Sequence, residues 1–341
     1  MQLPPPLRRA IDEELSAHAP ARLRAASARL SESYREPASH LALADDLHRA
    51  AYLAVRMPAT FAAVVAALDW TREACGNTSA DEIRTMLDLG SGPGTALWAA
   101  AQVFPTLASA TAIERDPQLI EIARRLSASA PAAGAASVAA YPSVLRNTQW
   151  QRGDLTTTLP EGAWDLVVCS YALNELAPAQ RAELLRRAWA RTAKLLVVVE
   201  PGTMAGFANI LAARTLLLGA SPANQGATLA APCPNALACP MAGSDWCHFA
   251  ARVERTATHR RLKDATLGHE DEKFSYVAFS RIPIENESQN PSARIVRHPR
   301  IFSGYAQLTL CREGQIAPAT VTRSHKEDWR RLKRLGWGDR W

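Results

Sequence analysis

Residues 83–100 read IRTMLDLGSGPGTALWAA and constrain the fold more than any other stretch of the chain. A short apolar run ends in an acidic residue, alternate glycines follow, and a helix-forming segment comes next. This order predicts a buried strand, a tight loop and the first turn of a helix. Glycine allows such a loop to turn sharply and to bring its backbone close to a ligand.

The alternation of strand and helix continues to residue 202. Apolar runs at 109–116, 163–173 and 194–202 predict strands, and the amphipathic segments 117–130 and 178–193 predict helices between them. Strands separated by helices form a parallel sheet that helices cover on both faces. We therefore predict an α/β fold built on a doubly wound, Rossmann-like sheet.

The regions that flank this core differ from it in composition. Helical segments precede it, cysteines among Pro, Gly and Asn follow it, and short apolar runs alternate with turns near the end of the chain. We predict an N-terminal helical region at 1–80, a nucleotide-binding core at 81–225, a cysteine-rich metal-binding insertion at 226–265, strands that complete the sheet at 266–325, and a basic tail with tryptophans at 326–341.

The glycine loop departs from the dinucleotide-binding pattern, because its spacing is G-x-G-x-G rather than G-x-G-x-x-G. Asp88 precedes the loop and suits a ligand with a positively charged amino-acid end. Glu114 ends the next strand, where a carboxylate can bind both ribose hydroxyls; a solvated charge is the alternative. Asp154 follows a third predicted strand and can accept a bond from an adenine amino group; a turn residue is the alternative.

This pattern resembles that of the class I methyltransferase family over residues 83–202. The resemblance implies binding of S-adenosyl-L-methionine by Asp88, Gly90, Ser91, Gly92, Gly94, Glu114 and Asp154. It identifies no catalytic residue. The segment SYALNEL places Ser170, Tyr171, Asn174 and Glu175 at the expected substrate edge, but it is not the N/D-P-P-Y/F signature of methylation on base amino groups. We expect Cys169, inside an apolar strand, to pack in the core.

Cys233, Cys239 and Cys247 follow a C-x5-C-x7-C pattern. Zinc ribbons usually have tighter C-x2–4-C pairs, and a reducing compartment disfavours disulfides. A tetrahedral site needs a fourth ligand, and the sequence offers Cys311, His248, His259 and Cys75. The wide spacing, with proline after two of the cysteines, favours a [4Fe–4S] cluster. Zinc and unligated cysteines are the alternatives.

Several further stretches carry a narrower resemblance: YLAVRMPATFAA, CPNALACP, SDWCHFAARVER, HRRLKD, HEDEKFSYVAFSR, LTLCREG and KEDWRRLKRLGWGD. They look like the methyltransferase-like family tied to assembly of the mitochondrial small ribosomal subunit, and its bacterial relatives. The resemblance runs from about residue 50 to the C-terminus. It implies a class I methyltransferase core with an iron–sulfur cluster, whose ligands fall on Cys233, Cys239, Cys247 and Cys311. It also implies binding to small-subunit rRNA during maturation. We expect no DNA or membrane partner.

Positive charge is concentrated near the end of the chain. The net charge is +6, and residues 251–341 hold 18 Lys and Arg against 11 Asp and Glu, whereas the rest holds 21 against 22. This asymmetry favours a polyanionic partner such as RNA; a solvated basic surface is the alternative. We predict a basic helix over 246–264 and another in the tail. Trp329 and Trp337 in that tail either stack on RNA bases or serve as hydrophobic anchors.

The chain begins MQLPPPLRRAIDEELSAH, which contains no apolar signal segment. Asp12, Glu13 and Glu14 argue against an organellar transit peptide. No apolar run approaches the ~20 residues of a membrane span. We therefore expect a soluble protein of the bacterial cytoplasm.

Three functions fit these observations. The first is a methyltransferase that modifies small-subunit rRNA, with a structural cluster. The second is a non-catalytic assembly factor that keeps the fold and occupies rRNA until the subunit matures. The third is a small-molecule methyltransferase.

Overall fold

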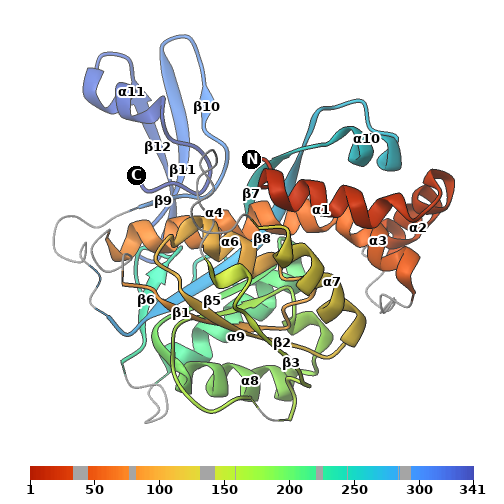
Figure 1. Cartoon of the computed structure of the whole chain (residues 1–341). Helices are drawn as coiled ribbons and strands as arrows, with labels where there is room; N and C mark the ends of the chain where they lie inside the picture. Colours follow the sequence, from red (N-terminus) through yellow and green to blue (C-terminus); the bar gives the residue numbers. More distant parts are fainter. Residues whose placement is uncertain are drawn as a thin grey trace.

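The computed structural model describes residues 1–33, 45–76, 82–130, 143–157, 159–219, 226–243, 245–282, 284 and 293–341. A large sheet lies between layers of helices, and a smaller sheet projects from this body (Figure 1). The predicted domain boundaries near residues 80 and 225 fall outside the described residues.

The large sheet has the strand order β3-β2-β1-β4-β5-β8-β6, with β7 paired to β8. Neighbouring strands from β3 to β5 are parallel, whereas β8 is antiparallel to β5, β6 and β7. The strands are β1 (Thr85–Leu89), β2 (Ser109–Glu114), β3 (Gln149–Arg152), β4 (Trp164–Ser170), β5 (Thr192–Pro201), β6 (Thr228–Ala231), β7 (Phe249–Glu254) and β8 (His269–Ser280). The predicted Rossmann-like α/β class is confirmed.

Helices cover both faces of this sheet, which explains why its central strands are apolar on both sides. In β4, Leu166 and Val168 belong to the core under α4 and α6, while Val167 and Cys169 belong to the core on the other face. The first layer consists of α4 (Met57–Cys75), α6 (Thr95–Val103) and α7 (Pro117–Ala128). The second consists of α8 (Pro178–Ala190) and α9 (Met204–Leu218). Short 3-10 turns occur at η1 (Ser143–Leu145) and η2 (Leu173–Glu175).

Three more helices precede the sheet: α1 (Pro5–Ser16), α2 (Pro20–Ser33) and α3 (Asp46–Val55). Asp45 caps α3, because its carboxylate accepts a hydrogen bond from the backbone N–H of His48 at 2.8 Å. Among the described residues, no single helix has the length and apolar character of a membrane span, although α3 and α4 taken together, bent by 49°, pass that test.

The helix predicted over 246–264 is wrong for its first half. Residues Phe249–Glu254 form strand β7, and only Ala257–Lys263 is helical, as α10. The alternation explains this result: Phe249, Ala251 and Val253 are buried, whereas Arg252 and Glu254 are exposed. That period of two matches a strand with one covered face.

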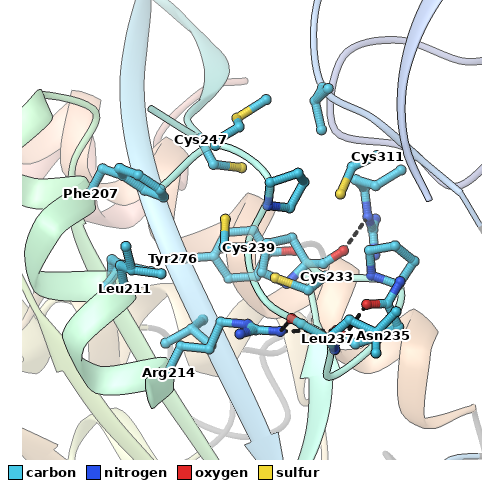
Figure 2. A pocket seen from close by; sticks show the side chains of 18 of the residues that line it. Phe207, Leu211, Arg214, Cys233, Asn235, Leu237, Cys239, Cys247, Tyr276 and Cys311 are labelled. Atoms are coloured by element: carbon cyan, nitrogen blue, oxygen red, sulfur yellow. Dashed lines mark hydrogen bonds between the residues drawn. The ribbon is translucent and has the colours of Figure 1, made fainter. Parts of the chain in front are cut away.

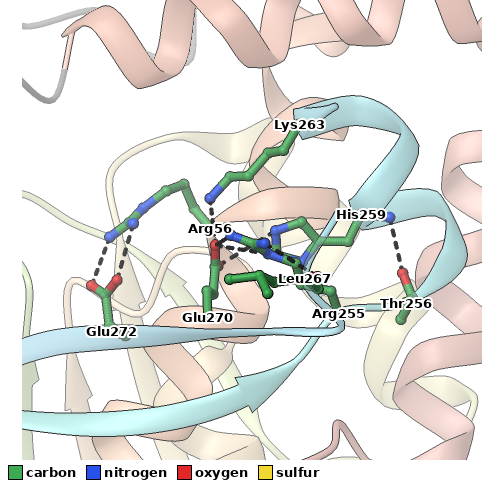
Figure 3. A network of polar contacts seen from close by, with 8 residues as sticks. All are labelled: Arg56, Arg255, Thr256, His259, Lys263, Leu267, Glu270 and Glu272. Atoms are coloured by element: carbon green, nitrogen blue, oxygen red, sulfur yellow. Dashed lines mark hydrogen bonds and ion pairs between the residues drawn. The ribbon is translucent and has the colours of Figure 1, made fainter. Parts of the chain in front are cut away.

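The β7–β8 hairpin is fastened to α10 and to the residue that precedes α4 by a group of partly buried charges (Figure 3). Glu270 accepts hydrogen bonds from Lys263 Nζ at 2.9 Å and from Arg255 Nη2 at 3.0 Å. Glu272 accepts one from Arg56 Nη2 at 2.9 Å. Burial lowers the pKa of His259, beside Glu270, to about 4, so its ring is neutral at pH 7.

Residues 293–341 form a second unit, which we call the arm. Its sheet comprises β9 (Arg294–Ile295), β10 (Arg300–Ile301), β11 (Tyr305–Arg312) and β12 (Gln315–Thr322), followed by helix α11 (Lys326–Leu332). We expected residues 266–325 to complete the main sheet. In the structure β8 lies in that sheet, whereas β9 to β12 pair only with one another among the described strands.

One face of the arm sheet packs under α11. Leu308, Leu310 and Val321 form its core with Trp329 and Leu332 of the helix. Trp329 is only 9% exposed, so of its two predicted roles the structure supports the hydrophobic anchor. Trp337 is also partly buried and packs edge-on against His248, with ring centroids 4.9 Å apart.

Candidate functional site

The glycine loop lies between β1 and α6, at the carboxyl ends of the parallel strands. Gly90 and Gly94 have positive φ angles of +74° and +85°, which L side chains rarely adopt. A Cβ on Gly90 would lie 2.9 Å from Ala172 Cβ, and one on Gly94 would lie 2.9 Å from the Trp150 ring. Gly92 also has a positive φ, of +53°, but a Cβ on it would meet no described atom within 4 Å. The first and third glycines are therefore required by packing, while the middle one faces open space.

Asp88 is fully buried next to this loop, and neither of its carboxylate oxygens has a hydrogen-bond partner among the described residues. Burial, reinforced by the nearby charge of Glu114, raises the pKa of Asp88 to about 8. The hydroxyls of Ser91 and Thr95 are also buried, and the described part of the chain offers them no partner. Buried polar groups are normally hydrogen-bonded, so this concentration around one loop is typical of a site for a ligand with hydrogen-bond donors.

Glu114 lies opposite the loop at the end of β2. Its Oε2 accepts a hydrogen bond from Gly92 N–H and its Oε1 accepts one from Asp116 N–H, both at 2.9 Å. Burial raises its pKa despite these bonds. The carboxylate is thus held in place, and each oxygen keeps a lone pair for a further donor.

Asp154 lies farther from the loop. It follows β3, the edge strand next to β2, and it is exposed. Its Oδ1 accepts hydrogen bonds from the backbone N–H and the hydroxyl of Thr156, at 2.8 and 2.7 Å, which lower its pKa. These contacts match the turn residue that the sequence left as the alternative. The structure therefore groups Asp88, Gly90, Ser91, Gly92, Gly94 and Glu114 around one loop, with Asp154 one strand away.

The carboxyl ends of β4 and β5 carry polar groups that sequence reasoning missed in part. Tyr171 has a φ of +56°, and its hydroxyl donates to Glu272 Oε1 at 3.3 Å. Glu200 is fully buried; it accepts from Asn209 Nδ2 at 2.9 Å and from Leu173 N–H at 3.2 Å. Burial raises the pKa of Glu200 to about 7. Asn174 is linked to this group through Asn209, at 2.7 Å.

A second candidate site lies where the main sheet meets the arm (Figure 2). Cys233, Cys239, Cys247 and Cys311 all line one cavity. The first three come from the segment between β6 and β7, and Cys311 approaches from β11 of the arm. Apolar side chains from α9, including Phe207 and Leu211, form another wall.

The thiols influence one another, which indicates their mutual proximity. Burial, then the neighbouring cysteines, raise the pKa of Cys247 well above its usual value and that of Cys311 to about 12. Burial also raises the pKa of Cys233. In the described part of the chain, no three His, Cys, Asp or Glu side chains are arranged closely enough to hold a single metal ion.

Two arginines, one from α9 and one from β9, lie buried at this cavity. Arg214 is 7% exposed and Arg294 is 3% exposed. Arg214 Nη2 donates to the backbone carbonyls of Asn235 and Leu237, and Arg294 Nε donates to that of Pro232 at 2.8 Å. Neither forms an ion pair with a described carboxylate. Two buried cations therefore border four thiols, an arrangement suited to an anionic group.

The other candidate ligands lie elsewhere. His248 stacks on Trp246 with centroids 4.9 Å apart, and Cys75 and Cys169 are buried in α4 and β4. None of these three, nor His259, lines the cysteine cavity.

The strand order, with one antiparallel strand inserted between β5 and β6, and the glycine loop after β1 define a protein with the class I methyltransferase fold. A family model described as "Mitochondrial small ribosomal subunit Rsm22" matches residues 46–341. The chain belongs to this Rsm22 family.

Its relatives include the human "Ribosome assembly protein METTL17, mitochondrial", which is 28% identical over 298 residues, covering 84% of this chain and 61% of that protein. The "Rsm22-cox11 tandem protein 2, mitochondrial" of Schizosaccharomyces pombe is 26% identical over 338 residues, covering 85% of this chain and 42% of that protein. The chain thus spans less than two thirds of the length of either relative.

Solved structures with a similar arrangement include magnesium protoporphyrin IX methyltransferase from Synechocystis with bound S-adenosylmethionine. Its TM-score is 0.40 and its identity 12%, over 66% of this chain and 80% of that one. The plantazolicin methyltransferase BpumL has a TM-score of 0.39 and 11% identity, over 66% and 85%.

The prediction of a bacterial cytoplasmic location is wrong. The family model and both curated relatives carry a mitochondrial description. The prediction relied on acidic residues near the start of the sequence. In the structure these residues belong to helix α1, and one of them, Glu14, pairs with Arg125 of α7 at 2.6 Å, so acidic residues at these positions are part of the folded protein and are no evidence about targeting.

Proposed function

We propose that this protein acts in assembly of a small ribosomal subunit by binding its rRNA, and that it holds a [4Fe–4S] cluster in the cysteine cavity and S-adenosyl-L-methionine at the glycine loop. The observation that carries the proposal is the convergence of Cys233, Cys239, Cys247 and Cys311 on one cavity. Membership of a family described by a ribosomal subunit, with a relative named as a ribosome assembly protein, supports the biological setting.

The cavity favours a cluster over a zinc ion. Zinc–sulfur bonds of about 2.3 Å draw four thiolates into a tight tetrahedron. The described cysteines line a shared space without forming a set close enough for one ion. A cubane is wider, and its thiolate-ligated form is anionic, which the buried Arg214 and Arg294 would compensate.

The test is anaerobic purification followed by iron, sulfide and zinc analysis, with absorption and electron paramagnetic resonance spectra. We expect about four irons per chain and broad absorption near ~400 nm, as thiolate-ligated clusters show. A colourless protein with stoichiometric zinc would show that the cysteines bind zinc and not a cluster. A protein that carries neither metal nor sulfide would leave the cysteines as packing residues.

The glycine loop fits S-adenosyl-L-methionine through its own residues. The carboxylate oxygens of Asp88, which have no partner among the described residues, would accept hydrogen bonds from the ammonium end of the ligand. Glu114 would accept hydrogen bonds from its ribose hydroxyls. Gly92 leaves room for the ligand because nothing lies near its Cβ position. Asp154 is retained as a proposed contact to the adenine, although its Oδ1 already serves Thr156.

Methyl transfer to rRNA is the second candidate. S-adenosyl-L-methionine supplies an electrophilic methyl group, and such transfer depends mainly on the positioning of the two reactants. The positive φ of Tyr171 and the raised pKa of Glu200 at the adjoining strand ends support this candidate, because backbone strain and perturbed pKa values cluster at functional sites.

Tritiated S-adenosyl-L-methionine with small-subunit rRNA separates these candidates. Methyl incorporation that Asp88→Ala abolishes supports the enzyme. RNA binding without incorporation supports an assembly factor with a methyltransferase fold. An absence of RNA affinity at modest salt would instead favour a small-molecule methyltransferase.

A further inference from the structure

The arm sheet has two unlike faces. Along β11 the side chains alternate: Ala306, Leu308 and Leu310 are buried under α11, whereas Tyr305 and Gln307 are exposed. Because directly paired residues of antiparallel strands share a face, the exposed face continues onto both neighbours of β11. Arg300 of β10 lies opposite Gln307, and Thr320 and Thr322 of β12 lie opposite Gln307 and Tyr305.

The two ends of this face also differ. At the near end Cys311 lines the cysteine cavity, and the β11–β12 turn at Gly314 lies against Leu237 of the cysteine segment. At the far end, the turn between β10 and β11 carries Phe302 and Tyr305. The face therefore begins at the body of the protein and runs out to the tip of the projecting arm (Figure 1).

The aromatic pair at the tip is unusual for a solvent-exposed turn. The rings of Phe302 and Tyr305 are stacked, with centroids 4.7 Å apart and planes inclined by 17°. Phe302 is 42% exposed and Tyr305 is 38% exposed. A hydrogen bond from Phe302 N–H to the Tyr305 carbonyl, at 2.9 Å, fixes the turn that presents them. Two large rings are thus held parallel and accessible.

The charge of the arm identifies what kind of partner suits these rings. Residues 293–341 contain 11 Lys and Arg against four Asp and Glu, a balance of +7 in a chain whose net charge is +6. Arg300 is exposed on β10, the strand that leads into the pair, whereas Arg323 is exposed just after β12 and its guanidinium lies over the Trp329 ring. Arg300 makes no ion pair with any described residue. A positive, aromatic, hydroxyl-bearing surface suits phosphates and bases together.

We propose that this face of the arm binds single-stranded RNA, with the rings of Phe302 and Tyr305 stacking on unpaired bases. The proposal rests on the rRNA-binding function and narrows it to unpaired segments. In a duplex the base faces are stacked inside the helix, so exposed aromatic rings reach them only in loops, bulges and ends. Arg300 contacts the backbone phosphates, while the rings discriminate unpaired from paired RNA.

The test is fluorescence anisotropy of the full chain with a labelled, unstructured RNA of about 12 nucleotides, within the ~4–16 nucleotide range of such sites, beside the same RNA annealed to its complement. We expect tighter binding of the single strand. Phe302→Ala and Tyr305→Ala should each weaken it roughly five- to hundredfold, the loss typical when a base loses its aromatic partner. Tyr305→Phe should retain most of the affinity, because it keeps the ring.

Salt dependence separates stacking from charge. The ring variants should keep the wild-type slope of affinity against salt, whereas Arg300→Gln should reduce that slope by about one phosphate contact. The matched control is Leu267→Ala, because Leu267 is apolar, 61% exposed and lies on the distant turn between α10 and β8. This variant should change neither the affinity for RNA nor its salt dependence.

The outcomes separate this inference from the function it rests on. If the wild type binds neither RNA, the rRNA-binding function fails. If it binds and the ring variants bind equally well, that function survives and the stacking face is excluded. A dimer that dissociates in Phe302→Ala, seen by analytical ultracentrifugation, would assign the face to a second copy and overturn the proposal.

Discussion

The two candidate sites are built in opposite ways. The glycine-loop site is almost contiguous: Asp88 to Gly94 supply most of it, and Glu114 is added by the neighbouring strand. The cysteine cavity is lined by residues of α9, of the segment between β6 and β7, of strand β8 and of two strands of the arm, β9 and β11. The first site is formed by the fold of one βα unit. The second can form only when two sheets have met, so whatever binds there also joins them.

The largest effect is expected for Cys311→Ser, which tests whether the cysteine cavity, unlike the glycine-loop site, joins the two sheets. If a cluster joins the arm to the body, the variant should lose nearly all iron, and its Tm should fall by roughly 10 °C, because metal binding is coupled to folding. Iron analysis and calorimetry measure the two losses. Cys169→Ala, which removes a buried thiol outside the cavity, is the control and should keep its iron. Full iron occupancy in Cys311→Ser would exclude it as a necessary ligand.

The next effect concerns pH and the glycine loop. The pKa of Asp88 is raised to about 8 by burial and by Glu114, against ~3.9 in an unfolded chain, so the native state binds the extra proton between these values. The contribution of Asp88 to stability is therefore present at low pH and is lost, by a few kcal/mol, as pH rises from about 4 to about 8. Asp88→Asn should remove that part of the slope in urea titrations of ligand-free protein. An unchanged slope would show that Asp88 is ionised in the native state.

A smaller effect is expected on ligand affinity. Asp88→Asn removes the carboxylate proposed for the ammonium end of S-adenosyl-L-methionine and should weaken binding about 10- to 100-fold, the range for hydrogen bonds to charged groups. Isothermal titration calorimetry measures this change. Iron content should stay at the wild-type level, since the two sites do not share residues. A parallel loss of iron would contradict their independence.

The smallest effect is electrostatic and concerns the cavity. Arg214→Met removes a buried positive charge, which disfavours the reduced, more negative form of a cluster. The reduction potential of the cluster should therefore fall by some tens of millivolts. This is a small part of the roughly 1 V range over which the potentials of protein-bound iron–sulfur clusters vary. Arg214→Lys keeps the charge and is the matched comparison in a redox titration followed by electron paramagnetic resonance. Equal reduction potentials in Arg214→Met and Arg214→Lys would show that the charge of Arg214 does not influence the cluster.

The sequence predicted the parts of the molecule whose signals are local. The strand, glycine loop and helix around Asp88 are adjacent in the chain, and the apolar runs of β4 and β5 already imply two covered faces. The alternation of buried and exposed residues in β7 is equally local, although the basic residues of 246–264 led to the prediction of a helix there. Attention to the period of Phe249, Ala251 and Val253 would have identified the strand.

The remaining features depend on tertiary contacts. Residue order cannot show that Arg214 and Arg294 border the same four thiols, although an arginine within an apolar helix already signals a buried charge in need of a partner. Asp154 occupies the expected sequence position, yet Thr156 two residues later engages it in a turn. The arm forms a separate sheet because its strands pair with one another and not with β8. The periodicity of a strand shows which residues are buried, but it does not show which strand is the neighbour.

Strand β8 sets limits on how the chain can change. Phe274, Tyr276 and Ala278 point to one face, Val277 and Phe279 to the other, and the same strand pairs with β5, β6 and β7. Adding or deleting one residue there would exchange the two sets at once and turn the Tyr276 ring away from the thiols. Insertions and deletions of single residues should therefore be absent from His269–Ser280 in related chains, whereas substitutions that keep side-chain volume are tolerated.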